Sequence, residues 1–152
     1  MDYNDYEEKG RKKLENLFNN SNKIAKYEFS KFKFERYDCL STGLTGELSV
    51  YEIKDRDIDS TKYETLMMER SKYDALIDVY KKSGYTPYYV NFYRDCIYIF
   101  PILSIDDIEN RTIELPCTRS TVNYGKKIIK RVIMLEKNEG ILIHNCNNSV
   151  IS

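Results

Sequence analysis

Three polar residues in the first third of the chain could act together chemically: Asp38, Glu52 and Lys54. Carboxylate oxygens are hard ligands that suit a divalent cation, and an ammonium beside such a cation can orient water or stabilise developing negative charge. Because successive side chains of a β-strand point to opposite faces, Glu52 and Lys54 would share one face. These residues predict a metal site if the fold brings Asp38 to Glu52.

A β-hairpin would bring them together. Residues 31–40 alternate between polar and apolar side chains, and residues 47–54 form a second apolar run, which predicts two strands joined by a turn near Thr45. In that register Asp38 lies opposite Glu52, and opposed Cβ atoms of an antiparallel pair lie about 4.5–5.5 Å apart. The alternative is a surface hairpin with a cross-strand ion pair, which stabilises a fold by less than ~1 kcal/mol.

The remaining pattern predicts an α+β protein. Apolar residues at spacings of three and four predict helices, alternation predicts strands, and Gly, Asn and Asp mark the turns. The expected elements are helices over 5–19 and 63–83, strands over 86–93 and 96–103, a short helix over 105–110, and two strands within 122–143 that meet at Asn138-Glu139-Gly140. With the hairpin, the order is α-β-β-α-β-β followed by a β-rich C-terminal extension.

The composition favours one soluble domain. The chain has 152 residues, 41% of them hydrophobic, and its mean hydropathy is −0.59. No run approaches the ~20 apolar residues that a membrane helix requires, and the N-terminus lacks a secretory apolar core. We therefore expect a cytoplasmic protein with no membrane partner, formed by a core over about 5–103 and an extension over about 104–152.

The formal net charge is zero, so the whole-molecule balance does not indicate nucleic-acid binding. A local basic excess lies over residues 119–137, and its candidates for contacts with a phosphate backbone are Lys126, Lys127, Lys130 and Arg131. A solvated charged face is the alternative reading. A single histidine, His144, leaves little basis for Ser-His-Asp or Cys-His catalysis.

The order of elements and the motif residues resemble the PD-(D/E)XK nuclease superfamily, also called the restriction-endonuclease-like fold. The matching residues are Asp38, Glu52, Ile53 and Lys54, in the run Tyr51-Glu-Ile-Lys-Asp-Arg. Residues 5–103 are similar to small phage- and bacterium-encoded members and to Holliday-junction resolvases of the archaeal type. Tyr37 departs from the pattern, since the family name places a proline there.

The resemblance implies a Mg²⁺-dependent hydrolase that cuts phosphodiester bonds, with DNA as the expected partner and Mn²⁺ as a substitute cofactor. Asp38 and Glu52 would hold the metal with the backbone carbonyl of Ile53, and Lys54 would orient or deprotonate the attacking water. Accessory roles would fall to residues on two helices, namely Glu8 or Glu15 on the first and Glu69 and Lys72 on the second. A homodimer is also implied. A catalytically inactive nuclease-fold protein that binds nucleic acid and an unrelated α+β interaction module remain alternatives.

Overall fold

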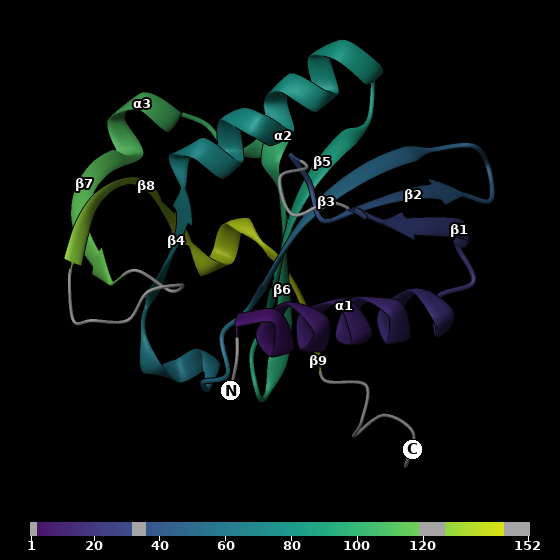
Figure 1. Cartoon of the computed structure of the whole chain (residues 1–152), viewed down its shortest axis with the longest axis horizontal. Coiled ribbons are helices and arrows are strands. Elements are labelled where there is room, and N and C mark those ends of the chain that lie inside the picture. The colour runs from purple at the N-terminus through teal and green to yellow at the C-terminus, as the bar shows by residue number, and fades with distance from the viewer. Residues whose placement is uncertain (1–2, 32–35, 119–126, 145–152) are drawn as a thin grey trace.

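The computed structural model describes residues 3–31, 36–118 and 127–144 (Figure 1). The first half contains α1 (Tyr3–Asn19), β1 (Ile24–Phe29), β2 (Cys39–Gly43), β3 (Leu48–Asp55), the 3₁₀ turn η1 (Ser60–Lys62), β4 (Thr65–Glu69) and α2 (Arg70–Ser83). The second half contains β5 (Thr86–Phe92), β6 (Cys96–Pro101), η2 (Ile102–Ser104), α3 (Ile108–Arg111), β7 (Thr112–Thr118), β8 (Lys127–Glu136), η3 (Lys137–Glu139) and β9 (Ile141–His144). The described helices include none that is long and apolar enough to cross a membrane.

The strands form two sheets. The larger has the order β1-β2-β3-β5-β6-β9, in which β3 and β5 are parallel and the other neighbours are antiparallel. The smaller has the order β4-β8-β7 and is wholly antiparallel. Two parallel neighbours need a crossover connection, and here β4 and α2 provide it between β3 and β5. Figure 1 shows the smaller sheet beside the larger one, with α1 crossing the larger sheet.

Each face of the central strands packs against a different helix, because residues of β3 alternate between the two faces. Val50 lies in the core that α2 covers, where it packs with a cluster that includes Leu76 and Tyr89. Tyr51 lies in the other core, with Leu14 and Phe18 of α1. The side chains that matter here, Glu52 and Lys54, share the face of Val50, as the alternation predicts.

Helix α1 approaches β3 closely and is held there by charge. A Cβ at Gly10 would lie 3.0 Å from Cγ2 of Ile53, so glycine allows the close approach. The ammonium of Lys13 lies 3.0 Å from both carboxylate oxygens of Asp55, whose side chain is only 2% exposed. The expected helix over 5–19 is confirmed, and its contact with β3 supports the strand that carries Glu52.

The hairpin is present, but its first strand is shorter than expected. β2 begins at Cys39, after Asp38, and pairs with β3 in the register Cys39 to Tyr51, which places Asp38 opposite Glu52 as predicted. Residues 32–35 of the predicted strand lie outside the described residues. The edge strand β1, which pairs with β2, was not among the expected elements.

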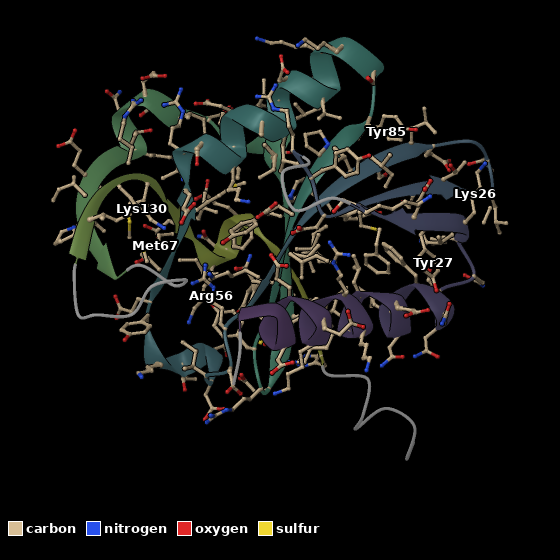
Figure 2. All side chains as sticks on the ribbon, in the orientation of Figure 1. Lys26, Tyr27, Arg56, Met67, Tyr85 and Lys130 are labelled. Atoms are coloured by element: carbon tan, nitrogen blue, oxygen red, sulfur yellow. The ribbon has the colours of Figure 1, made fainter. Side chains whose placement is uncertain are left out.

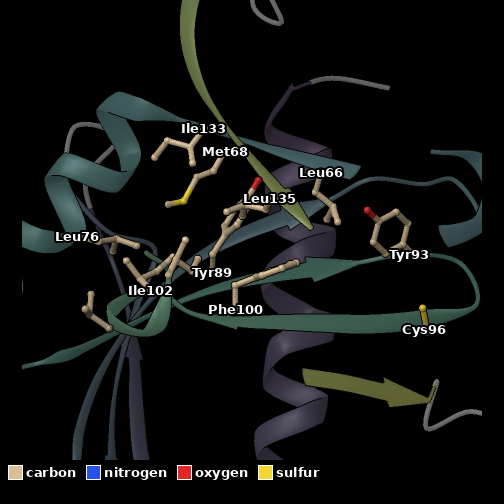
Figure 3. Packing of buried hydrophobic residues seen from close by; sticks show 12 residues of the cluster. Leu66, Met68, Leu76, Tyr89, Tyr93, Cys96, Phe100, Ile102, Ile133 and Leu135 are labelled. Carbon is tan, nitrogen blue, oxygen red and sulfur yellow. The ribbon is translucent and has the colours of Figure 1, made fainter. Parts of the chain in front are cut away.

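The expected helix over 63–83 is wrong in its first third. Helix α2 begins at Arg70, and residues before it form β4, in which Leu66 and Met68 are buried while Met67 between them is 40% exposed. This alternation suits a strand, and pairing with β8 buries the side chains against Ile133 and Leu135 (Figure 3). The helix end is as expected, since Gly84 has φ +76° and donates its N–H to the carbonyl of Tyr80.

The C-terminal part differs most from expectation. The two predicted strands exist as β8 and β9, but they do not form a hairpin, because η3 at the predicted turn carries the chain from the smaller sheet to the larger one. Strand β7 was not predicted, and the short helix expected from Ile105 begins only at Ile108, after Asp107 in a left-handed conformation. The segment after residue 104 therefore contributes strands to both sheets, β7 and β8 to the smaller one and β9 to the larger one.

Candidate metal site

Asp38 is held in place by its backbone and by its side chain. Its N–H donates to the carbonyl of Tyr51 at 2.9 Å, and its carbonyl accepts the N–H of Ser30 at 2.9 Å. One carboxylate oxygen, Oδ2, accepts the backbone N–H of Ile53 at 2.7 Å. Asp38 is thus fixed between β1 and β3 although it lies just outside β2.

The carboxyl groups of Asp38 and Glu52 are in contact and share a hydrogen bond. Glu52 is buried in the middle of β3, with 12% of its side chain exposed. Burial, and then the charge of Asp38, raise the pKa of Glu52 to about 8. Burial also raises the pKa of Asp38, against the opposing effect of the Ile53 N–H group and of Lys72 and Arg11. The two neighbouring buried carboxyl groups therefore hold their protons more tightly than exposed carboxyl groups do.

Lys72 supplies a cation at this acid pair. It lies in the first turn of α2, and its Nζ is 3.4 Å from Oε1 of Glu52. The charge of Lys72 also lowers the pKa of both Asp38 and Glu52. The side chain is 47% exposed, so water screens this ion pair in part. Lys72 therefore offsets only part of the negative charge.

Lys54 follows Glu52 on the same face of β3 but has different neighbours. Its ammonium interacts with Arg56, Glu69, Glu52 and Lys130. Burial, and then the charge of Arg56, lower its pKa, although the residue as a whole is exposed. An ammonium surrounded by protein yet reached by water can hold a solvent molecule next to Glu52.

The donor set fits a small hard cation. Asp38 and Glu52 offer carboxylate oxygens in contact, and the carbonyl of Ile53 leaves β3 on the same side as the N–H that Asp38 accepts. Mg²⁺ keeps several waters and binds through one or two carboxylates, so it needs no larger set of ligands. The described part of the chain contains no group of three or more His, Cys, Asp or Glu side chains arranged for a metal. The residues present therefore fit Mg²⁺ or Mn²⁺ better than a metal that needs thiolate or imidazole ligands.

The accessory candidates are spread over several elements. Glu8 is exposed on α1, and Glu15 accepts a hydrogen bond from the hydroxyl of Tyr27 at 3.0 Å. The α1 side chain whose charge reaches Asp38 is Arg11, whose guanidinium donates to Ser30. Neither glutamate is brought to the acid pair.

The other candidates lie on or near β4 and β8. Glu69 is the last residue of β4, not part of the helix, and its Oε1 is 2.6 Å from Nζ of Lys130. Arg131 is exposed on β8, facing away from Lys130. Lys126 lies outside the described residues, and the side chain of Lys127 is not described. The structure thus brings Glu69 and Lys130 to the neighbourhood of Lys54.

Two further residues at this place, Arg56 and Asn91, were not predicted from the sequence. Lys54 pairs with Asn91 of β5 in the parallel register, so both side chains lie on the face of Glu52. The Nε of Arg56 donates to Oδ1 of Asn91 at 2.8 Å. The sequence held one signal for Arg56, which follows Lys54 at the same two-residue spacing that separates Lys54 from Glu52.

The larger mixed sheet is flanked by α1 and α2, and the expected α+β class with a mixed sheet between helices is confirmed. Among solved structures, the chain matches Hjc, a Holliday junction resolvase from the archaeal hyperthermophile Archaeoglobus fulgidus. The TM-score is 0.55 at 12% sequence identity, and the match covers 88% of this chain and 90% of Hjc. A scan of protein-family models and a search of curated proteins give no match. The likeness to Hjc shows the fold alone.

Proposed function

We propose that this protein is a metal-dependent nuclease that hydrolyses phosphodiester bonds in DNA. The observation that carries the proposal is the contact between the buried carboxyl groups of Asp38 and Glu52, whose pKa values are both raised. Two adjacent buried acids are suited to bind a divalent cation, whose charge would offset the cost of their burial as carboxylates. The fold shared with a Holliday junction resolvase supports the same proposal.

Each residue of the site has a role in this chemistry. A bound Mg²⁺ would polarise the phosphate and lower the pKa of a coordinated water. Asp38, Glu52 and the carbonyl of Ile53 would hold the cation, and the Ile53 N–H keeps the Asp38 carboxylate oriented for it. Lys54, on the same face as Glu52, would position the attacking water and stabilise charge on the phosphate. Lys72 would remain beside Glu52 and steady the acid pair before the metal binds.

A cleavage assay tests the proposal. The protein is incubated with linear, nicked, single-stranded and four-way DNA in Mg²⁺, in Mn²⁺ and in EDTA. We expect cutting of at least one substrate in Mg²⁺ or Mn²⁺ and none in EDTA. Glu52→Gln and Lys54→Met should each lower the rate by about 100-fold or more. The matched control is Glu114→Gln, which changes an exposed glutamate of β7 and should cut like the parent protein.

Two results would reject the proposal in different ways. Full activity in both variants would remove Glu52 and Lys54 from the reaction. Salt-sensitive DNA binding with no cutting under either metal would instead identify a protein that has the nuclease fold without catalysis.

The proposal also covers the location of the protein in the cell and its oligomeric state. We place the protein in the cytoplasm, where DNA and Mg²⁺ are both present, and we propose that it acts as a homodimer. Light scattering during size-exclusion chromatography measures the mass directly, and a mass near 18.1 kDa at assay concentration would contradict the dimer.

A further inference from the structure

Three cationic side chains gather beside the acid pair, where the two sheets meet. Lys54 and Arg56 project from the end of β3 and the residue after it, and Lys130 projects from β8. The charges of Arg56 and Lys130 both act on Lys54. Figure 2 shows Arg56, Met67 and Lys130 close together near β4. We call Lys54, Arg56 and Lys130 the basic cluster.

The guanidinium of Arg56 is fixed in one orientation by neutral groups. Besides the bond to Asn91, its Nη2 donates to the carbonyl of Met67 at 2.9 Å and to the hydroxyl of Tyr89 at 3.0 Å. Asn91 is fully buried, so its carboxamide has little freedom. All three acceptors are uncharged, and no carboxylate of the described residues forms an ion pair with Arg56. Its positive charge is therefore oriented but not neutralised by contact.

Several hydrogen-bond donors around the fixed Arg56 side chain have no protein acceptor among the described residues. Within the described residues, Nη1 of Arg56 makes no hydrogen bond, and Lys54 has no ion-pair partner within 4.0 Å. The amide nitrogen of Asn91, Nδ2, is buried and has no partner among these residues either. Lys130 is paired with Glu69 at 2.6 Å. The basic cluster thus holds three positive charges with one carboxylate in direct contact.

A fixed arginine fork flanked by lysines suits a phosphate group. Arginine presents parallel N–H donors that match phosphate oxygens, and a preorganised side chain loses little entropy when it binds. Nucleic acids carry phosphates at regular intervals, so a strand with one phosphate at the acid pair brings another to a neighbouring cationic site. A carboxylate ligand would satisfy the same donors but would lack this repeat.

We infer that Arg56 and Lys130 of the basic cluster bind a backbone phosphate of the nucleic-acid strand, next to the phosphate that Lys54 meets at the acid pair. This inference rests on the proposed function and adds the path that the substrate strand takes across the protein. The substrate strand runs from Asp38 and Glu52 toward β4 and β8, so the smaller sheet contributes to binding.

A competing explanation is that Arg56 only braces the fold, because its bonds tie β4 to β5. A brace and a phosphate ligand differ in one measurable quantity, the salt dependence of DNA binding. A plot of log K against log salt has a negative slope. Each phosphate contact that is lost reduces the magnitude of this slope by about 0.9 for duplex DNA, whereas a loss of folding stability leaves the slope unchanged.

The test uses fluorescein-labelled duplex and four-way DNA in Ca²⁺, which permits binding while cleavage is followed separately in Mn²⁺. Anisotropy titrations are made between about 50 and 200 mM salt. We expect Arg56→Gln and Lys130→Gln each to reduce the magnitude of the salt slope by about 1 and to weaken DNA binding by about 10-fold. The matched control is Lys26→Gln, an exposed lysine of β1 at the opposite edge of the molecule, which should keep the slope (Figure 2).

The Lys130→Gln variant keeps the test decisive if Arg56→Gln fails to fold, since the Lys130 side chain is 28% exposed and its ion pair is with the surface residue Glu69. Parent-like slopes and affinities in the folded variants would overturn the inference. Failure of the proposed function would look different, because the parent protein would then cut no DNA in Mn²⁺ whatever slopes the variants give.

Discussion

The acid pair predicts that Glu52 destabilises the metal-free protein increasingly as the pH rises. The pKa of Glu52 is about 8 in the folded protein against an ordinary value of 4.5, so the folded state holds a proton that the unfolded state releases. The contribution of Glu52 to stability is therefore fully present below pH 4.5 and is lost as the pH rises toward 8. The maximum slope for one group is about 1.4 kcal/mol per pH unit.

Glu52→Gln isolates this effect, because glutamine has the shape of the protonated acid and never ionises. Between pH 4.5 and 7.5 the penalty for one carboxyl has an upper limit of about 4 kcal/mol. Lys72 offsets part of it, and the site can relax, so we expect the variant to gain about 1–3 kcal/mol over the parent at pH 7.5. Near pH 4.5 the two proteins should be almost equal in stability.

Urea denaturation in EDTA at pH 4.5, 6 and 7.5 measures the free energy of unfolding. Glu114→Gln controls for the loss of an exposed glutamate. Saturating Mn²⁺ should stabilise the parent protein more than the Glu52→Gln variant, because the metal binds the folded parent more tightly. The difference in free energy of unfolding between the two proteins should therefore shrink or change sign. A variant that is less stable than the parent by the same amount at all three pH values would refute the reasoning that burial and the charge of Asp38 raise the pKa of Glu52.

Three further changes have expected outcomes. Lys72→Met removes a cation 3.4 Å from Glu52 and should tighten Mn²⁺ binding by about 10-fold or more in a calorimetric titration. Gly10→Ile forces side-chain atoms into the 3.0 Å approach to Ile53 and should lower the free energy of unfolding by about 1–3 kcal/mol in urea. Asp55→Ala removes both bonds to the Lys13 ammonium and should cost about 1–3 kcal/mol in the same measurement.

The contrary results are specific to each change. Unchanged or weaker Mn²⁺ binding in Lys72→Met would mean that this lysine does not compete with the metal. Parent-like stability in Gly10→Ile would show that α1 can move away from β3 without loss. An Asp55→Ala variant as stable as the parent would show that the ion pair only replaces equivalent contacts with water.

The sequence was a good guide to the hairpin because the information there is local. Alternation sets which residues share a face, and the turn between Gly43 and Glu47 sets the register, so Asp38 is brought to Glu52. Gly46, with φ +92°, adopts the backbone conformation that favours glycine in such a turn. Nothing distant was needed to predict this part of the site.

The rest depended on contacts that local patterns do not encode. The residues Leu66-Met67-Met68 suit a helix or a strand, and only pairing with β8, far along the chain, selects the strand. That error placed Glu69 on a helix and hid its ion pair with Lys130. Arg56 was missed for a similar reason, since its partners Met67, Tyr89 and Asn91 come from two other strands.

The pairing of β4 with β8 also affects the order in which the protein is assembled during synthesis. Asp38 and Glu52 leave the ribosome early, but the strand that fixes Met67, and through it Arg56, needs residues up to Glu136. A nascent chain therefore carries the two acids before Met67, whose carbonyl accepts a hydrogen bond from Arg56, is fixed by β8. We expect fragments that end before Lys127 to leave Leu66 and Met68 uncovered and prone to aggregation.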